Sequence, residues 1–107
     1  MDLQAGEVIL KNNQTAYADL LVFHTLTFKG AKISYTVIRA DLVEQGEIHL
    51  SYNRFADTAQ IVTVANFDDT GVYFCASVDR QYVRLLYVST DTGVQPIFKH
   101  SITYYPL

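Results

Sequence analysis

Apolar and polar side chains alternate along most of this chain, which is the pattern of strands that bury one face. Ile33, Tyr35 and Val37, for example, are separated by polar neighbours, while Gly, Asn and Asp interrupt the alternation at short intervals. Almost no helix is expected. We predict strands over residues 7–11, 15–28, 32–39, 47–52, 60–66, 71–79, 82–89 and 97–105.

Three segments depart from simple alternation. Residues 15–28 are long enough for two strands or one bent strand, and a shift of the pattern near His24 predicts a β-bulge. Residues 41–46 predict a single helical turn or a loop. Strand 82–89 is apolar on both faces, because Leu86 and Val88 alternate with Leu85 and Tyr87. This is typical of a central strand or of a strand covered by a neighbouring subunit.

The length of 107 residues predicts one domain, residues 1–107, with a single hydrophobic core. Half of the residues are apolar or aromatic and 18% are charged, so the chain has the composition of a folded domain. An open sheet would leave an apolar face and two edges in water. The predicted fold class is therefore all-β, an antiparallel β-sandwich of about eight strands that is jelly-roll-like.

The segment that begins at Asp68 contains the pattern D-x-G-x-Y-x-C of an immunoglobulin variable domain, with Asp69 and Cys75 at its ends. That domain requires a second Cys and usually a core Trp, whereas this chain has one Cys and no Trp. We therefore interpret the segment as a turn capped by Asp68 and Asp69, followed by a core strand. Tyr73 is expected to hydrogen-bond locally, and Cys75 is expected to be a small core residue.

Charge and hydropathy exclude two classes of partner. The net charge is −3 and the eight basic residues are scattered, whereas phosphate binding needs clustered Lys and Arg. We expect no nucleic-acid partner. No apolar run reaches the roughly 20 residues that span a bilayer, and the start of the chain does not look like a signal peptide, so no membrane insertion is expected.

Few residues offer catalytic or metal-binding chemistry. His24, His49 and His100 fall on three separate strands without close spacing, which predicts no metal site. The acidic residues are dispersed, and no G-x-S-x-G, P-loop or C-x-x-C motif occurs. The sequence therefore predicts neither an enzyme nor a cofactor, and no catalytic residue is assigned.

Binding chemistry is better represented, because Tyr and Arg are over-represented in binding hot spots and the chain has eight Tyr. Tyr35, Tyr73 and Tyr87 lie inside predicted strands, where Tyr is a good strand former. Two groups beside predicted turns are better candidates for stacking on sugars or for protein contact. The predicted ligand-binding residues are Tyr52, Asn53, Arg54, Phe55, Arg80, Gln81 and Tyr82.

Five short patterns occur in order along most of the chain. They are Asn12-Asn13-Gln14, Tyr35-x-Val37-x-Arg39, Glu44-x-Gly46, Gly71-Val72-x-Phe74, and Tyr87-x-Ser89-Thr90 with Gly93. Together they resemble a module that recurs near the ends of bacteriophage tail-fibre proteins and related bacterial fibres. Tyr104 and Tyr105 depart from that pattern, because the last strand of the module usually carries basic residues.

The resemblance implies a non-catalytic receptor-binding or adhesive tip domain, the distal part of a longer fibre protein. It implies a homotrimer on a virion tail fibre or cell-surface fibre, outside the cell, whose loops bind a cell-surface glycan or protein of a target cell. Two alternatives remain open. One is a monomeric carbohydrate-binding β-sandwich module, and the other is a structural or trimerisation domain of a fibre.

Overall fold

A computed structural model describes residues 3–67 and 69–105 of the chain. All the regular secondary structure within these residues is β-strand, which confirms the predicted all-β class. The strands are β1 (Leu3–Ile9), β2 (Ala18–His24), β3 (Gly30–Arg39), β4 (Leu42–Asn53), β5 (Thr58–Phe67), β6 (Val72–Asp79), β7 (Tyr82–Ser89) and β8 (Ile97–Tyr104).

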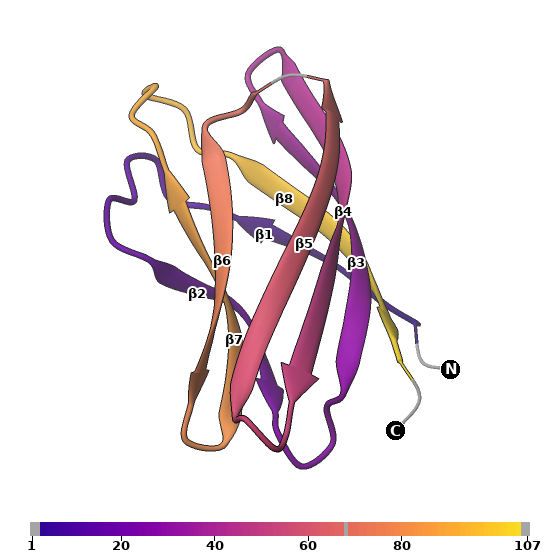
Figure 1. The fold of residues 1–107 in the computed structure, drawn as a ribbon. Helices are drawn as coiled ribbons and strands as arrows, with labels where there is room; N and C mark the ends of the chain where they lie inside the picture. The colour runs from indigo at the N-terminus through magenta and orange to yellow at the C-terminus, as the bar shows by residue number, and fades with distance from the viewer. Residues whose placement is uncertain (1–2, 68, 106–107) are drawn as a thin grey trace.

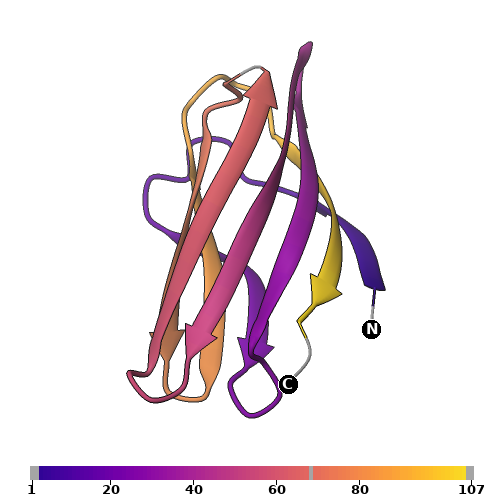
Figure 2. The ribbon, with the colours of Figure 1, turned by 45° about the vertical axis from the view of Figure 1, so that its right-hand side comes forward.

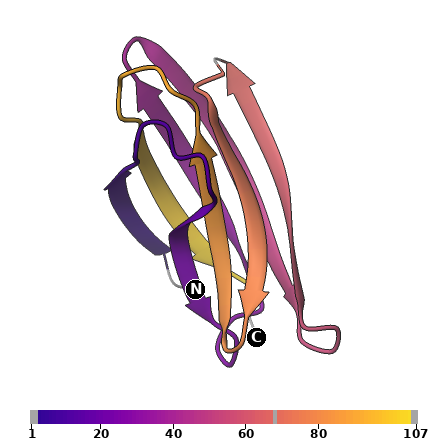
Figure 3. The same cartoon turned by 90° about the vertical axis from the view of Figure 1, so that its left-hand side faces the viewer.

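The strands form two antiparallel sheets that face each other as a sandwich (Figures 1, 2 and 3). The larger sheet has the order β1-β8-β3-β4-β5, and the smaller sheet has the order β2-β7-β6. β1 pairs with β8 and β2 pairs with β7, and this nesting of late strands against early ones is a feature of jelly rolls. The chain crosses between the sheets after β1, β2, β5 and β7.

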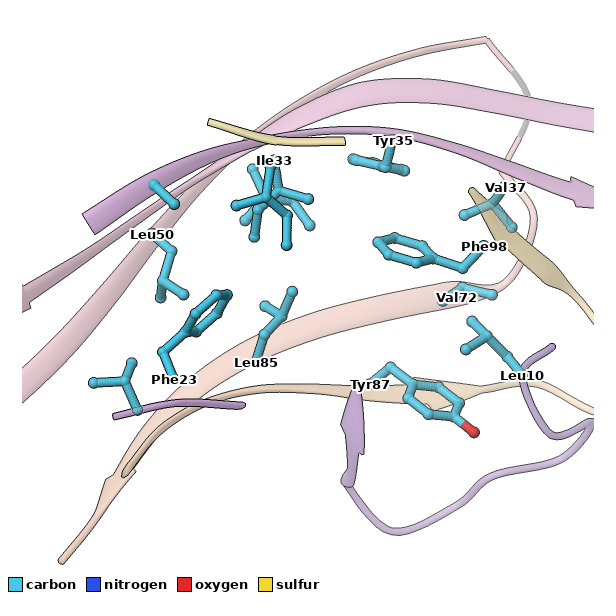
Figure 4. Close-up of a cluster of buried hydrophobic side chains, with 14 of the residues drawn as sticks. Leu10, Phe23, Ile33, Tyr35, Val37, Leu50, Val72, Leu85, Tyr87 and Phe98 are labelled. Carbon is cyan, nitrogen blue, oxygen red and sulfur yellow. The ribbon is translucent and has the colours of Figure 1, made fainter. Parts of the chain in front are cut away.

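The core lies between the sheets and contains the residues that the alternation places inward (Figure 4). Ile33, Val37 and Leu50 from the larger sheet are completely buried, as is Leu85 from the smaller sheet. Phe98 of β8 stacks on the ring of Tyr35 at 5.7 Å between centroids. Burial of each large apolar side chain contributes about 1.5–3 kcal/mol, so this layer is the main source of stability.

The helical turn or loop predicted at residues 41–46 is wrong. Arg39 pairs directly with Leu42, so a two-residue turn of Ala40 and Asp41 joins β3 to β4, and β4 runs without interruption to Asn53. The turn depends on a left-handed backbone at Ala40, with φ 54°. Alanine seldom adopts that conformation, which is why the sequence does not reveal the turn.

Two other strand predictions need correction. The irregularity in β2 lies between Asp19 and Leu21, not near His24, which pairs in regular register with Tyr82. β1 covers Leu3–Ile9 instead of residues 7–11. Just past β1, the Leu10 N–H donates to the carbonyl oxygen of Pro96 at 2.8 Å in continuation of the β1–β8 pairing, and the chain then crosses to the smaller sheet.

Cys75 is not the core residue that the sequence predicts. It alternates with Phe74 and Ala76, which pack on the core, and it is only partly buried. Its register partner on β7 is Leu86, which also alternates with core residues. Cys75 and Leu86 therefore lie on the outer face of the smaller sheet.

The predicted capping role of Asp69 is confirmed, whereas Asp68 lies outside the described residues. The Asp69 Oδ1 accepts the Gly71 N–H at 2.9 Å, and its carboxylate also accepts the Tyr73 hydroxyl at 3.1 Å. Gly71 has φ +76°, and a Cβ there would approach the Thr90 hydroxyl oxygen to 2.2 Å. Only glycine both adopts this positive φ readily and leaves room for the Thr90 hydroxyl.

At the end of the sandwich that contains Gly71, a buried arginine hydrogen-bonds to three of the connections that run from one sheet to the other. Arg39 is 1% exposed, and all five of its N–H donors are used. Its guanidinium donates to the carbonyl oxygens of Thr70 (2.9 Å), Thr90 (2.6 Å) and Val94 (2.9 Å), to the Thr90 hydroxyl (3.3 Å) and to the Asn12 Oδ1 (2.6 Å). These acceptors belong to the β1–β2, β5–β6 and β7–β8 connections. We call this set the Arg39 network.

A buried carboxylate continues the network into the larger sheet. Glu44 accepts the Thr70 hydroxyl at 3.0 Å and the Tyr35 hydroxyl at 2.8 Å. Burial, together with the hydrogen bond and the charge of Glu44, raises the pKa of Tyr35 far above its ordinary value. The Tyr35 hydroxyl therefore stays protonated and keeps donating to the carboxylate. Thr70 thus joins Arg39 to Glu44.

We expect Arg39→Lys to lower the free energy of unfolding by roughly 3 kcal/mol, because a lysine has three donors and leaves buried carbonyl oxygens unsatisfied. Chemical denaturation measures the change. Arg80→Lys is the matched control in an exposed turn and should change stability by less than about 0.5 kcal/mol. Equal effects of the two substitutions would contradict the role assigned to Arg39.

Candidate functional site

Three connections meet at the end of the sandwich opposite the Arg39 network. They are residues 25–29 between β2 and β3, residues 54–57 between β4 and β5, and residues 80–81 between β6 and β7 (Figures 1 and 2). Both groups of predicted ligand-binding residues lie at this end. Loops held by a rigid sheet scaffold are common positions for binding residues.

The β4–β5 hairpin is shaped by its own polar side chains. The Asn53 Oδ1 accepts the backbone N–H of Phe55 at 3.0 Å and that of Ala56 at 3.2 Å, which folds the turn. Asp57 closes it with a left-handed backbone, φ 54°, and its Oδ1 accepts the Tyr52 hydroxyl at 2.8 Å. That hydrogen bond raises the pKa of Tyr52 above its ordinary value. The Phe55 ring at the tip is fully exposed.

Thr25, in the β2–β3 connection, hydrogen-bonds to both the β6–β7 turn and the β4–β5 hairpin. Its N–H donates to the Gln81 carbonyl oxygen at 2.8 Å, and its carbonyl oxygen accepts from Arg54 Nη2 at 3.3 Å. The ring of His24 also meets the edge of the Tyr82 ring at 5.5 Å between centroids. The structure thus brings the two predicted groups to one surface through residues that the sequence did not single out.

A pocket of about 670 Å³ lies between residues 25–29 and the β4–β5 hairpin. This volume is within the range of small-ligand sites. Phe28 is almost completely buried and stacks on Phe23 at 4.4 Å, whereas Leu26 is 72% exposed. We call this cavity the loop-end pocket. It is lined by Leu26, Phe28, Lys29, Ser51, Tyr52, Asn53, Arg54, Phe55, Thr58 and Gln60.

The lining matches one of the two predicted groups. Tyr52, Asn53, Arg54 and Phe55 all line the pocket, whereas residues 80–82 lie beside it and do not. Leu26, Phe28 and Lys29, which the β2–β3 connection contributes, were missed, because nothing in their local sequence shows that they face the hairpin. Ser51 and Gln60 carried a weak signal, since both are polar positions near the ends of predicted strands that border a predicted turn.

The lining is positively charged. Lys29 and Arg54 contribute two cations, and none of the described residues that line the pocket is acidic. The hydroxyl and amide groups of Ser51, Thr58 and Gln60 add hydrogen-bonding capacity. The pocket thus combines apolar surface, neutral polar groups and positive charge.

A second, shallower depression of about 700 Å³ crosses the outer face of the larger sheet. Its side chains include Glu7, Lys99 and Glu47, together with short hydroxyl groups. Lys99 and Glu7 lie 4.0 Å apart as a solvent-exposed ion pair, which contributes little binding energy. The depression is less enclosed and lacks exposed aromatic rings, so the loop-end pocket is the stronger candidate.

The three histidines lie on β2, β4 and β8. Among the residues that the structure describes, no group of three His, Cys, Asp or Glu side chains is placed to hold a metal ion. His49 is 3.2 Å from the Glu47 carboxylate at the surface. His100 points to the inner side of the larger sheet, where a Cβ on Gly6 would come within 2.9 Å of its ring.

Comparison of the sequence with protein-family models and with curated proteins finds no match. In the described part of the chain, no helix has the length and apolar character needed to cross a membrane.

His100 gives this fold a pH dependence. Burial lowers its pKa below the ordinary 6.5, and within the described residues its Nδ1 is buried without a hydrogen-bond partner. The unfolded chain therefore binds the proton at this residue more readily, so the contribution of His100 to stability should be constant above about pH 6.5 and fall as the pH decreases below it.

We expect His100→Gln to flatten the dependence of unfolding free energy on pH between about 7.5 and 5. Denaturation at several pH values measures this slope. His49→Gln is the matched control, because His49 is partly exposed and already has a carboxylate neighbour. A slope that is unchanged in His100→Gln would contradict the assignment.

Proposed function

We propose that this chain is a non-catalytic receptor-binding domain of the tail-fibre kind, which attaches to a glycan or protein on the surface of a target cell. The supporting observation is the loop-end pocket, where exposed aromatic and cationic side chains meet on connections held by the sandwich. Such sites bind ligands in many β-sandwich domains. The domain would act outside the cell, on a virion tail fibre or a cell-surface fibre.

The composition of the pocket favours binding over chemistry. None of the described residues that line it is His, Cys, Asp or Glu, so these residues provide no imidazole, carboxylate or thiol for catalysis or metal binding. It does provide Phe55 and Tyr52, whose rings can stack on the C–H face of a sugar, and polar groups that can bond to hydroxyls. A saccharide unit on the target surface fits this chemistry best.

The outer face of the smaller sheet supports the proposed homotrimer. Leu86, Val88 and Cys75 lie there partly buried, and Tyr73 is exposed beside them. Val88 and Tyr73 are register partners, as are Leu86 and Cys75, so the four side chains form one apolar area. Contact with two further copies of this chain would remove that area from water.

We expect light scattering to give the mass of three chains. Leu86→Glu should dissociate the assembly, because it places a charge in the proposed contact. Val64→Glu on the exposed outer face of β5 is the matched control and should leave the mass unchanged. The Cys75 thiol should react slowly with a maleimide in the assembly and faster in Leu86→Glu. A wild-type mass of one chain would exclude the trimer.

One observation favours a second candidate, a monomeric carbohydrate-binding module. The loop-end pocket combines the exposed ring of Phe55 with the hydroxyl and amide groups of Ser51, Thr58 and Gln60, which suits a saccharide whatever the number of associated chains. Glycan binding by a single-chain species would identify the module. Glycan binding by three associated chains would support the fibre domain.

Phe55→Ala should weaken attachment to target cells, and binding to any glycan found on an array, by about tenfold or more, because exposed aromatic anchors dominate such contacts. Tyr17→Ala is the matched control, since Tyr17 is an exposed aromatic residue in the connection between β1 and β2 at the other end of the sandwich. Unchanged attachment in Phe55→Ala would remove the loop-end pocket from the receptor site and favour a structural domain.

A further inference from the structure

We infer that the loop-end pocket selects an acidic saccharide, a sugar unit that carries a carboxylate or a phosphate, and holds the anionic group with Lys29 and Arg54. This inference rests on the proposed binding function and adds the chemical class of the ligand.

The two cations of the pocket are not neutralised within the described residues. No carboxylate of that part of the chain lies within 4.0 Å of the Lys29 or Arg54 nitrogens. Asp57 is the acidic residue of the same β4–β5 hairpin, and its Oδ1 accepts the Tyr52 hydroxyl at 2.8 Å. The formal charge of the whole chain is −3, so the pocket is a local positive site on an acidic domain. A ligand anion would find its most favourable position there.

Arg54 is positioned with donors to spare. Its Nη2 donates to the carbonyl oxygens of Thr25 at 3.3 Å and Leu26 at 3.5 Å, which anchors one side of the guanidinium. Its Nε and Nη1 make no hydrogen bond to the described residues. Arg39, in contrast, uses every donor for structure. A planar guanidinium with two free nitrogens matches the two oxygens of a carboxylate or phosphate.

The apolar part of the pocket indicates a ring beside the anion. Phe55 is fully exposed and Leu26 is 72% exposed, while Phe28 forms the buried floor. A bare inorganic anion would leave this apolar surface in water. A sugar ring can place its C–H face on Phe55 while its acidic substituent reaches Lys29 and Arg54.

The neutral polar lining separates a sugar from an acidic peptide. Ser51, Thr58 and Gln60 supply hydroxyl and amide groups that both donate and accept hydrogen bonds. Ring hydroxyls also do both, so they match these groups better than the acceptor-only carboxylates of an acidic peptide.

The test is an array of matched glycan pairs, in which each acidic sugar stands beside its neutral counterpart. One arm contains sialylated and uronic-acid glycans with their desialylated or carboxyl-reduced forms. The other arm contains phosphorylated glycans and the same glycans after phosphatase treatment, which distinguishes the two sources of the anion. We expect at least one acidic form to bind about tenfold more tightly than its neutral partner. Raising the salt from about 0.05 to 0.5 M should reduce that preference.

Variants then test the assigned residues. Arg54→Gln and Lys29→Gln should each lower the ratio of acidic to neutral binding by about tenfold, whereas Phe55→Ala should weaken both members of a pair. Arg80→Gln is the matched control, because it removes a positive charge from the same end of the molecule but not from the pocket lining. Thermal unfolding of each variant confirms that it is folded.

The outcomes separate this inference from the function on which it rests. Equal binding of neutral and acidic partners, with Phe55→Ala still weakening both, would overturn the acidic preference and leave the receptor-binding proposal standing. Binding of a poly-glutamate peptide in place of every acidic glycan would overturn the saccharide class. Failure to bind any glycan or target cell would overturn the inference and the proposed function together.

Discussion

The burial of the Arg39 guanidinium is the constraint on which the rest of this fold depends. A buried cation is stable only when its donors are satisfied, and here they are satisfied by oxygens from three connections that are far apart in the sequence. Each of these connections carries the chain from one sheet to the other. One side chain at the end of β3 therefore fixes how the two sheets are joined, while the apolar layer between them supplies most of the stability.

The Arg39 network accounts for much of the pattern formed by the five short sequence motifs. Asn12, Arg39 and Thr90 belong to the pattern and are members of the network, and Glu44 and Gly71 belong to the pattern and lie directly beside it. Tyr87 and Ser89 hold the β1–β2 connection against β7, through the Lys11 N–H at 3.0 Å and the Gln14 N–H at 3.0 Å. The pattern thus describes how one end of the sandwich is closed. The loop-end pocket lies at the other end and contains none of its residues.

The sequence predicts the sandwich well because alternation depends only on which side of a strand faces the core, as Val83, Leu85 and Tyr87 show. It fails where backbone geometry is set by tertiary contacts. Ala40 adopts an unfavourable left-handed turn that closes a long hairpin, and Cys75 is apolar yet lies on the outer face. The pocket was predicted only where its residues flank a turn. Leu26, Phe28 and Lys29 could not be assigned, because the β2–β3 connection meets the hairpin only after the sheets have packed.

The separation of the two ends has an evolutionary consequence. The molecule measures 41 Å along its longest axis, with the Arg39 network at one end and the loop-end pocket at the other. The stability effects of substitutions that share no partners add independently. The exposed positions of the β4–β5 hairpin can therefore change without disturbing the contacts that close the sandwich. The fold can conserve its closure while natural selection varies the hairpin, so the proposed binding surface can diversify on an unchanged framework.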